Sequence, residues 1–319
     1  MEQTRKTKIL VTGIGGPAGI NIVRLLKERS DVEVTGCDVD ATAAGQFFVE
    51  HFIIAPFVRD AATYKEWMIR TVNEGGFDIV IPTVGEELEV LATFVSEVNA
   101  YVSLSPLSTL SLCADKHVAY EWVKEHLPEY AAASILLKDW TPDWKDYADF
   151  FIKPRSGRGG RGCKVITKEE LVWLKEHESN LEDFVVMECL PGTEWTIDVY
   201  VAKNDEVVYC IPRERLGLAG GISIKGRTIR QPLVLEATKL LLSKLDISGP
   251  ICVQFKTDSA GIPRFVEINP RLSGGLMISV AGGIDPVVAL LNDFKGESGV
   301  PQEWNEVTVV GYFEYKQLQ

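Results

Sequence analysis

Glycine and positive charge are concentrated in one short stretch, residues 151 to 165, which reads FIKPRSGRGGRGCKV. Backbone N–H groups of such a glycine-rich stretch can close around phosphate oxygens, and Lys153 can add an ammonium to the same phosphates. The stretch is not a P-loop, because G-x-x-x-x-G-K-[ST] occurs nowhere in the chain. It predicts a phosphate cradle, with a solvated hairpin tip as the alternative. Its glycines are Gly157, Gly159, Gly160 and Gly162.

Residues 251 to 271 read ICVQFKTDSAGIPRFVEINPR, which is typical of a β-hairpin. Two apolar strands flank the turn sequence TDSAG. If the turn centres on Ala260 and Gly261, Gln254 pairs directly with Glu267. The hairpin therefore brings two oxygen-bearing side chains together across neighbouring strands.

One face of this hairpin is expected to be polar. Side chains of a strand alternate between its two faces, so Glu267, Asn269 and Arg271 point the same way, beside Gln254. Carboxylate and amide oxygens without histidine or cysteine suit Mg²⁺. The alternative is an ordinary strand that faces solvent.

A second glycine loop lies near the start of the chain, at residues 13–18, which read GIGGPA. With Asp38 at the end of the next predicted strand, it fits the dinucleotide-binding pattern G-x-G-x-x-G/A. Glycines are also needed for a tight turn in any doubly wound fold, and a substrate can bind in this crevice. Glu86 and Glu87, which begin a predicted helix at the same sheet edge, are either ligand contacts or charges that complement the helix dipole.

Composition limits the classes of function. The chain has 319 residues and a formal net charge of -12, which argues against a general binder of nucleic acid or anionic membranes. No apolar run approaches the ~20 residues of a membrane span, and no signal peptide is expected at the start. The six cysteines contain no CxxC pair, which predicts reduced thiols, a cytoplasmic protein and no zinc site.

The first third of the chain predicts a parallel α/β sheet, because apolar strands alternate with amphipathic helices. The expected strands are residues 8–13, 32–38 and 77–83, and the expected helices are 17–29, 63–74 and 86–98. A linker that runs into a helix is expected around residues 107–115.

From about residue 148 the pattern changes to short strands with hairpin turns, which predicts an α+β unit with antiparallel sheet. The expected strands are FFIKP, CKVIT, FVVMECL, TIDVYVAK, EVVYCIPRE and the two strands of ICVQF…RFVEIN, with helices at 168–177 and 233–245. We place the domain boundary near Ser108.

Three segments, in this order along the chain, resemble the ATP-grasp superfamily: FIKPRSGRGGRG, MECLPGTE and VQF…VEINPR. The resemblance is greatest to one synthetase half of the carbamoyl-phosphate synthase large subunit, and ILVTGIGGPAGIN resembles the domain that precedes the ATP-grasp module in that group. It implies a Rossmann-like pre-ATP-grasp domain at 1–107 and a two-lobed ATP-grasp domain at 108–319. The smaller lobe would span 115–187 and the larger lobe 188–319.

The resemblance implies where ATP would bind. Lys116 and Lys153 resemble the two basic positions that contact phosphates, and residues 156–162 resemble a mobile flap over them. Glu188 would lie near the exocyclic amine of adenine, and Glu194 resembles the ribose-binding acid. The implied nucleotide-binding residues are Lys116, Lys153, Ser156, Gly157, Gly159, Gly160, Gly162, Glu188, Leu190 and Glu194. Two alternatives stay open: a solvated helix charge for Lys116, and an edge strand for FVVMECL.

The resemblance also implies a metal site and catalytic residues. Gln254, Glu267 and Asn269 would hold Mg²⁺ or Mn²⁺, although many family members carry a second acid where this chain has Gln254. Lys153, Asn269 and Arg271 would be catalytic, with Arg271 beside the reacting phosphoryl group. The stretch 212–228 has no assigned place: Arg213, Arg215 and Lys225 face either ligands or solvent.

The implied function is an ATP- and Mg-dependent ligase that activates a carboxylate as an acylphosphate. An amine or another nucleophile would then attack, and ADP and phosphate would be released. The implied partners are these small molecules, and no nucleic acid or membrane is expected. Whether the chain forms a homodimer is left open. One ATP-grasp unit without a glutaminase segment argues against complete carbamoyl-phosphate synthesis. The alternatives are an NAD(P)-binding oxidoreductase or sensor that uses GIGGPAG and Asp38, and a non-catalytic ATP-binding regulator.

Overall fold

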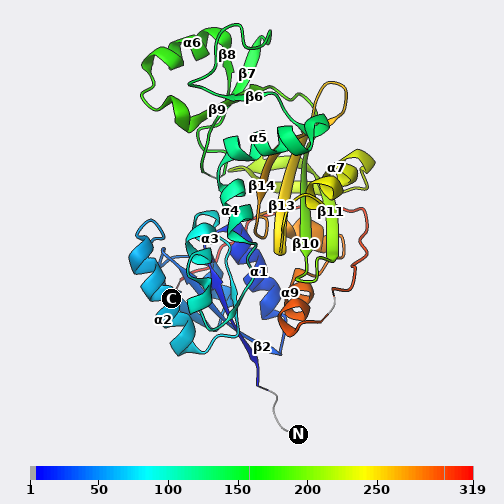
Figure 1. Cartoon of the computed structure of the whole chain (residues 1–319). Helices are drawn as coiled ribbons and strands as arrows, with labels where there is room; N and C mark the ends of the chain where they lie inside the picture. Colours follow the sequence, from blue (N-terminus) through cyan, green and yellow to red (C-terminus); the bar gives the residue numbers. More distant parts are fainter. Residues whose placement is uncertain (1–4, 158, 298, 319) are drawn as a thin grey trace.

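The computed structural model of the chain describes residues 5–157, 159–297 and 299–318. It contains a five-stranded, a four-stranded and a six-stranded sheet (Figure 1). The five-stranded sheet comes first along the chain and lies at the lower end in Figure 1, and the four-stranded sheet lies at the opposite end. No helix among the described residues is both long enough and apolar enough to cross a membrane.

The N-terminal sheet has the strand order β3-β2-β1-β4-β5, and every pairing in it is parallel. The predicted parallel α/β sheet is therefore confirmed. Its strands are β1 (Thr7–Thr12), β2 (Val32–Asp38), β3 (His51–Ile54), β4 (Ile79–Ile81) and β5 (Tyr101–Val102). The sequence patterns did not reveal β3 and β5, which are short.

Helices cover both faces of this sheet. Ile9 packs in a cluster with Ile22 of α1 (Pro17–Lys27), whereas Leu10 packs on the other face with Met68 of α2 (Ala61–Gly75). This alternation follows from the two-residue period of a strand. The second face is completed by α3 (Gly85–Ala92), which is shorter than the predicted helix and is followed by a separate turn of 3₁₀-helix.

The four-stranded sheet forms a small lobe with antiparallel pairings in the order β6-β9-β7-β8. Its strands are β6 (Ser134–Leu136), β7 (Asp149–Pro154), β8 (Lys164–Thr167) and β9 (Phe184–Glu188). The helix α6 (Lys168–His177) begins where Thr167 and Glu170 form a capping box. Its Leu171 packs on Phe150 and Ile166 of the sheet.

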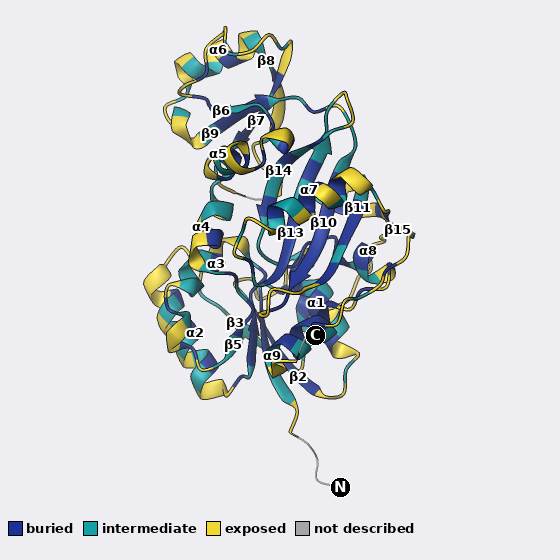
Figure 2. Cartoon of the chain, turned by 45° about the vertical axis from the view of Figure 1, so that its right-hand side comes forward, coloured by how far each residue is buried: buried dark blue, intermediate teal, exposed yellow. Residues whose placement is uncertain are grey.

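The six-stranded sheet has the order β14-β13-β10-β11-β12-β15 and is antiparallel throughout. Its strands are β10 (Glu194–Val201), β11 (Val207–Ala219), β12 (Ile222–Thr228), β13 (Gly249–Thr257), β14 (Pro263–Asn269) and β15 (Thr308–Val310). One face is apolar, where Trp195 and Ile197 pack with side chains of α5 (Lys116–His126) and α7 (Pro232–Leu242). Figure 2 shows these central strands as mostly buried.

The expected linker is helical. α4 (Leu107–Ala114) is followed directly by α5, whose N-cap Asp115 accepts hydrogen bonds from the backbone of His117 and Val118. A boundary near Ser108 therefore falls in the first turn of α4. We propose the division into 1–107 and 108–319, with lobes at 115–187 and 188–319, because the three sheets lie within these ranges.

The last part of the chain returns to the N-terminal domain. α8 (Leu276–Ala281) and α9 (Pro286–Lys295) contribute Leu276, Leu290 and neighbouring side chains to the cluster that contains α1. The Asp293 carboxylate accepts hydrogen bonds from the hydroxyls of Tyr101 (2.7 Å) and Tyr200 (3.2 Å). The N-terminal sheet and the larger lobe are thus packed against each other. The 3₁₀-helices are Ala44–Phe48, Val95–Glu97, Pro128–Tyr130 and Leu181–Asp183.

Candidate functional site

The second face of the six-stranded sheet is polar in the part that contains Gln254, Glu267 and Arg213. Gln254 pairs with Glu267 across β13 and β14, as predicted. The reason differs in part from the expected one, because beyond this pair the register shifts to Phe255 opposite Phe265. The bulge next to Gln254 places one extra residue in β14, so the loop beyond it is one residue shorter than the expected register would give. The row continues through Thr196, which pairs with both Gln254 and Arg213.

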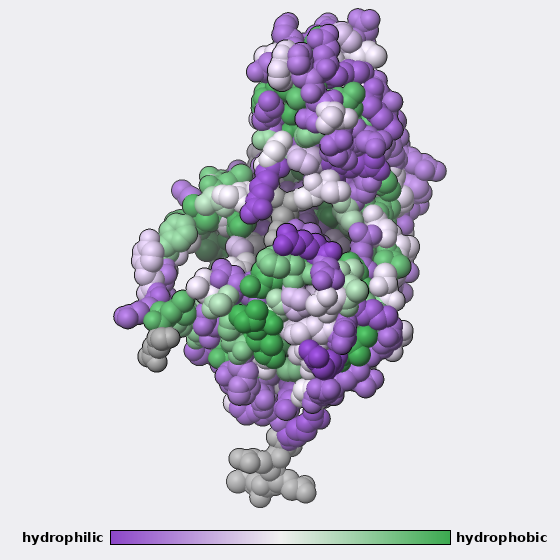
Figure 3. All heavy atoms as spheres, turned by 90° about the vertical axis from the view of Figure 1, so that its left-hand side faces the viewer, coloured by the Kyte–Doolittle hydropathy of each residue, from purple (hydrophilic) through white to green (hydrophobic). Residues whose placement is uncertain are grey.

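A narrow cleft lies over this polar face. Figure 3 shows the molecule hollowed between its upper lobe and the body below. The sheet lines the cleft with Thr196, Arg213, Arg215, Cys252, Gln254, Glu267 and Asn269. The loops that complete the lining are 157–159 (Gly157 and Gly159), 221–223 and the residues after β14, namely Arg271 and 273–275.

The three residues of the EINPR segment are linked by hydrogen bonds. Asn269 donates to Glu267 Oε1 (2.9 Å), and Arg271 donates to Asn269 Oδ1 (3.2 Å). Gln254, Glu267 and Asn269 thus present carboxylate and amide oxygens on one wall of the cleft. This donor set fits a hard cation such as Mg²⁺, which prefers oxygen ligands.

Lys153 lies beside this wall and is 3% exposed. Its ammonium donates to the carbonyl of Val266 (3.1 Å) and lies 4.8 Å from the centre of the Tyr120 ring. Burial lowers the pKa of Lys153, and the nearby Glu267 carboxylate opposes that effect. A buried ammonium without a carboxylate in direct contact gains most from an anionic ligand.

Lys116 is the first residue of α5, and its ammonium donates to the carbonyl of Gly157 (2.9 Å). Burial also lowers the pKa of Lys116. The helix is tied to the glycine-rich stretch by a second contact, because Arg155 forms an ion pair with Asp115 (2.6 Å). Both lysines therefore lie where the glycine-rich stretch meets the large sheet.

The glycine-rich stretch is a loop between β7 and β8. Gly157, Gly159, Gly160 and Gly162 all have positive φ, a conformation that disfavours other residues. Ser156 and most of the loop are exposed, and Arg158 lies outside the described residues. The loop can therefore be reshaped by a ligand, as a phosphate cradle requires.

The stretch that sequence patterns did not place forms the β11–β12 hairpin. Its turn at Gly220 and Gly221 touches the glycine-rich loop, since a Cβ on Gly221 would lie only 2.8 Å from the backbone of Gly159. Arg215 donates to the side chains of Glu194, Gln254 and Ser223. The first part of β11 was predicted as the strand EVVYCIPRE, but bulges near Arg215 and Gly217 interrupt the periodic pattern beyond it, which explains why the rest of the hairpin was missed.

The N-terminal domain borders the same cleft. Asn21 of α1 donates to the carbonyl of Gly274 (3.1 Å), and a Cβ on Gly85 would lie 3.8 Å from Arg271 Nε. Glu87 does not face the cleft, because it is 3% exposed and its carboxylate accepts hydrogen bonds from Thr12, Tyr64 and the backbone of residues 83 and 84. It caps its own helix, which is the alternative that sequence reasoning left open.

Asp38 is engaged within the first glycine loop. Its carboxylate accepts hydrogen bonds from the backbone of Gly15 (2.7 Å) and Asp40 (3.0 Å). A dinucleotide ribose would compete with these contacts. Asp38, the residue that would bind the ribose in a dinucleotide site, thus stabilises the loop instead.

Residues 180–315 match the family described as ATP-grasp in the biosynthetic pathway with Ter operon. The chain is thus similar, over less than half of its length, to an ATP-grasp domain. No curated protein matches it.

Solved structures show the same fold at low sequence identity. N5-carboxyaminoimidazole synthetase from Staphylococcus aureus, complexed with ADP, has a TM-score of 0.73 at 17% identity over 95% of this chain and 82% of that chain. The biotin carboxylase domain dimer of Hydrogenobacter thermophilus 2-oxoglutarate carboxylase, complexed with MgADP, ADP and bicarbonate, has a TM-score of 0.73 at 18% identity over 92% and 71%. L-amino acid ligase from Bacillus licheniformis has a TM-score of 0.70 at 17% identity over 92% and 75%.

The ATP-grasp resemblance also assigned roles to Glu188, Leu190 and Glu194. The structure places Glu188 and Leu190 at and just after the end of β9, where the Glu188 carboxylate accepts a hydrogen bond from the backbone of Ala133 (2.8 Å). Glu194 begins β10 and is linked to the cleft through Arg215. An adenine contact by Glu188 would require that carboxylate to share or leave its backbone partner.

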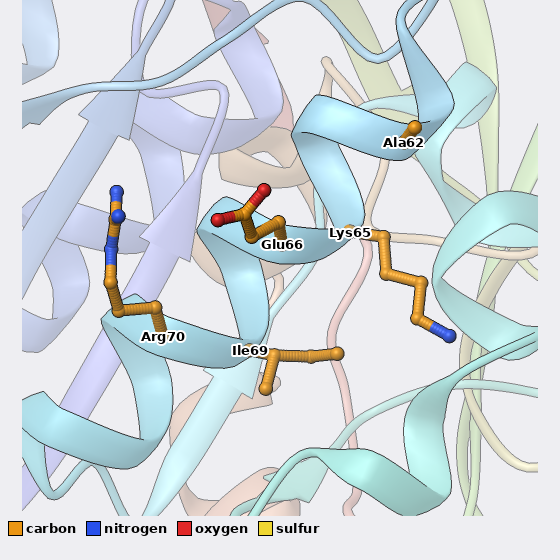
Figure 4. A pocket seen from close by; sticks show the side chains of 5 residues that line it. All are labelled: Ala62, Lys65, Glu66, Ile69 and Arg70. Atoms are coloured by element: carbon orange, nitrogen blue, oxygen red, sulfur yellow. The ribbon is translucent and has the colours of Figure 1, made fainter.

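A second depression lies over α2, and it shares no lining residue with the cleft described above (Figure 4). Its lining consists of Ala62, Lys65, Glu66, Ile69 and Arg70. All five residues come from one helix, and Lys65 and Arg70 point away from one another. Its polar groups do not converge, so we assign the chemistry to the cleft.

Proposed function

We propose that this protein is an ATP-grasp enzyme, namely an ATP- and Mg-dependent, ADP-forming ligase that activates a carboxylate for attack by an amine or another nucleophile. The observation that carries the proposal is that three features lie in or directly beside one cleft. They are the oxygen wall of Gln254, Glu267 and Asn269, the buried ammonium of Lys153, and the glycine-rich loop.

The nucleotide phosphates would lie between the glycine-rich loop and the large sheet. Lys116 and Lys153 approach this space from α5 and β7, and backbone N–H groups of 156–162 can turn toward phosphate oxygens. Each contact adds fixed positive potential where the transferred phosphoryl group carries charge. Closure of the loop excludes water and strengthens these interactions.

Gln254, Glu267 and Asn269 would hold Mg²⁺ or Mn²⁺. When bound there, the ion neutralises charge on the phosphate oxygens. Arg271 lies next to this set through its contact with Asn269, so its guanidinium can orient the substrate carboxylate or the phosphate that leaves.

The reaction would proceed in two displacements. A carboxylate oxygen attacks the γ-phosphorus in line, the bond to the β-phosphate oxygen breaks, and ADP leaves. The nucleophile then attacks the acyl carbon of the acylphosphate, and phosphate leaves with the electron pair of the C–O bond. The chain's part is positioning and electrostatic stabilisation, without a protein nucleophile.

The test is a pooled screen of carboxylates and amines for coupled release of ADP and phosphate. The pool includes amino acids and bicarbonate, since an L-amino acid ligase and a carboxylase domain bound to bicarbonate share this fold. We expect at least one pair of substrates to raise ADP release well above the background with ATP alone.

The metal gives a further prediction. Because the proposed ligands are all oxygens, activity should require Mg²⁺ or Mn²⁺ and should survive a chelator selective for zinc. Measured rates with each ion and each chelator check this. Loss of activity on removal of zinc alone would overturn the ligand assignment.

Two other functions remain testable beside this one. Titration with NAD(P) and with MgADP separates the oxidoreductase reading from the ATP reading, and the hydrogen bonds that engage Asp38 favour ATP. A non-catalytic regulator would bind MgADP and show no turnover with any pool of carboxylates and amines.

A cytoplasmic location and a homodimer remain part of the proposal. The six unpaired cysteines support the cytoplasmic location.

A further inference from the structure

One arginine of the cleft is buried with an incomplete set of partners. Arg213 is 2% exposed, and its Nε donates to Asp198 Oδ2 (2.9 Å) while its Nη2 donates to Ser273 Oγ (3.0 Å). Its Nη1 is buried and has no hydrogen-bond partner among the residues that the structure describes. A buried donor without an acceptor is unfavourable, so such a group in a cleft calls for an explanation.

The surroundings of this guanidinium keep space for a ligand. A Cβ on Gly275 would lie 2.6 Å from Arg213 Nη1, and the observed φ of Gly275 is -99°, which any residue can adopt. Glycine is therefore needed here for access to the arginine rather than for backbone conformation. Gly275, Ser273 and Arg213 all line the cleft.

The arginine is held in place from behind. Asp198 is 2% exposed, and its Oδ2 also accepts a hydrogen bond from Ser279 of α8 (2.5 Å). Asp198 is absent from the cleft lining, whereas Arg213 is part of it. Asp198 and Ser273 thus fix the guanidinium plane and leave one edge for a group that accepts hydrogen bonds.

The neighbourhood on the cleft side is positive. Arg271 and Arg215 line the same cleft as Arg213, and Arg215 and Arg271 already contact Gln254 and Asn269. Arg213 reaches the end of the cleft formed by residues 273–275, where Asn21 and Pro17 of the N-terminal domain approach Gly274. An oxyanion placed there would meet a rigid donor without displacing any contact.

We propose that Arg213, Ser273 and Gly275 form an oxyanion subsite, distinct from the triphosphate contacts at Lys116 and Lys153. It would bind a carboxylate or phosphate group of the second substrate. The role of the subsite in binding a second substrate rests on the proposed ligase function. Binding of an oxyanion to the subsite can be measured without turnover.

The experiment measures binding of acetate, malonate and inorganic phosphate by calorimetry at constant ionic strength, with and without MgADP. Gly275→Ala keeps every charge and places a methyl group against Nη1. The double variant Arg213→Gln/Asp198→Asn removes both charges, so no carboxylate is left buried alone. Arg227→Ala is the matched control, since Arg227 is a half-exposed cation on the neighbouring β12 that pairs with Glu214.

The expected result is that at least one probe binds the wild-type protein, and that its affinity falls by about tenfold or more in both test variants, which is the loss typical of one charged hydrogen bond. Arg227→Ala should bind as wild type does. Preference for phosphate over the carboxylates, or the reverse, identifies the group that the subsite receives.

Three outcomes separate this inference from the proposed function. If no probe binds the wild type in either state, or if both test variants bind as tightly as the wild type, Arg213 is only a structural ion pair and the inference is wrong. If MgADP fails to bind the wild-type protein, the proposed function is wrong. Normal MgADP binding by a test variant that has lost the probe supports both.

Discussion

At the scale of single residues, Lys153 carries the largest expected effect. Within the described part of the chain, its buried ammonium has only a backbone carbonyl as hydrogen-bond acceptor, so it is available to phosphate oxygens. A charged hydrogen bond of this kind contributes about 1.5–3 kcal/mol. Lys153→Ala should therefore lower the rate of ADP release by an order of magnitude or more.

The matched variant for this prediction is Asp38→Ala, which removes a charge at the first glycine loop. It should leave MgADP affinity nearly unchanged, because Asp38 contacts its own loop. Calorimetry and coupled ADP release measure both variants. If Asp38→Ala abolishes nucleotide binding while Lys153→Ala leaves binding and ADP release unchanged, the nucleotide binds at the first glycine loop and the ligase proposal is wrong.

Glu87 predicts a pH dependence of stability. Burial raises the pKa of its carboxyl group, although hydrogen bonds from Thr12 and Tyr64 oppose the shift. The folded state then binds this proton more tightly than the unfolded state. The associated stability is present below the ordinary glutamate pKa of about 4.3 and is lost as the pH rises through the raised value.

Glu87→Gln removes this titration while preserving the shape of the side chain. The variant should gain free energy of unfolding relative to the wild type as the pH rises above the ordinary glutamate pKa of about 4.3. Urea unfolding at several pH values measures the difference. A difference that stays constant as the pH rises above that value would contradict the prediction.

At the scale of elements, the glycine-rich loop should change on nucleotide binding. Trypsin should cleave at Arg161, which is exposed, and cleavage should slow several-fold when ATP and Mg²⁺ are added, because loop closure protects local backbone. The neighbouring Arg158 offers a second cleavage site. Lys145, exposed in another loop of the same lobe, is the internal control and should be cut equally in both states. Equal cleavage at Arg161 would count against a phosphate cradle.

The elements also show what a sequence alone can predict. The hairpin at 251–271 was predictable down to the pairing of Gln254 with Glu267, because two apolar strands flank a clear turn. The bulge beside that pair was not, since it depends on packing rather than on a local pattern. The first part of β11, which carries Arg213, was predicted as the strand EVVYCIPRE, whereas its continuation through Arg215 and the whole of β12 were missed because bulges interrupt the two-residue period.

At the scale of the whole molecule, the N-terminal sheet and the larger lobe behave as one packed body. Asp293 of α9 accepts hydrogen bonds from Tyr101, Tyr200 and the backbone of Lys203, and it is 3% exposed. Contacts so distant along the chain leave no trace in local sequence patterns. This explains why the parallel sheet and an antiparallel α+β unit could be anticipated but their junction could not.

This junction makes a prediction about stability. Tyr101→Phe keeps the ring and removes one hydrogen bond to a buried carboxylate, which should cost about 1.5–3 kcal/mol in the free energy of unfolding. Urea unfolding with an unchanged m-value would establish the loss. Tyr312→Phe, in an exposed ring, is the control and should have no effect. Equal stability of both variants would contradict a joint role for Asp293.

The packing of α1 against α8 and α9 also has a consequence for biosynthesis. α1 ends at Lys27, whereas α9 begins at Pro286, so the face of the first sheet that α1 covers stays incomplete for most of translation. At ~5–20 residues per second, that delay is on the order of tens of seconds. During it, apolar side chains such as Ile22 and Leu26 lack their late partners. A nascent chain stopped before α8 should therefore be a client for chaperones that bind apolar surface at the ribosome, and the finished chain should not.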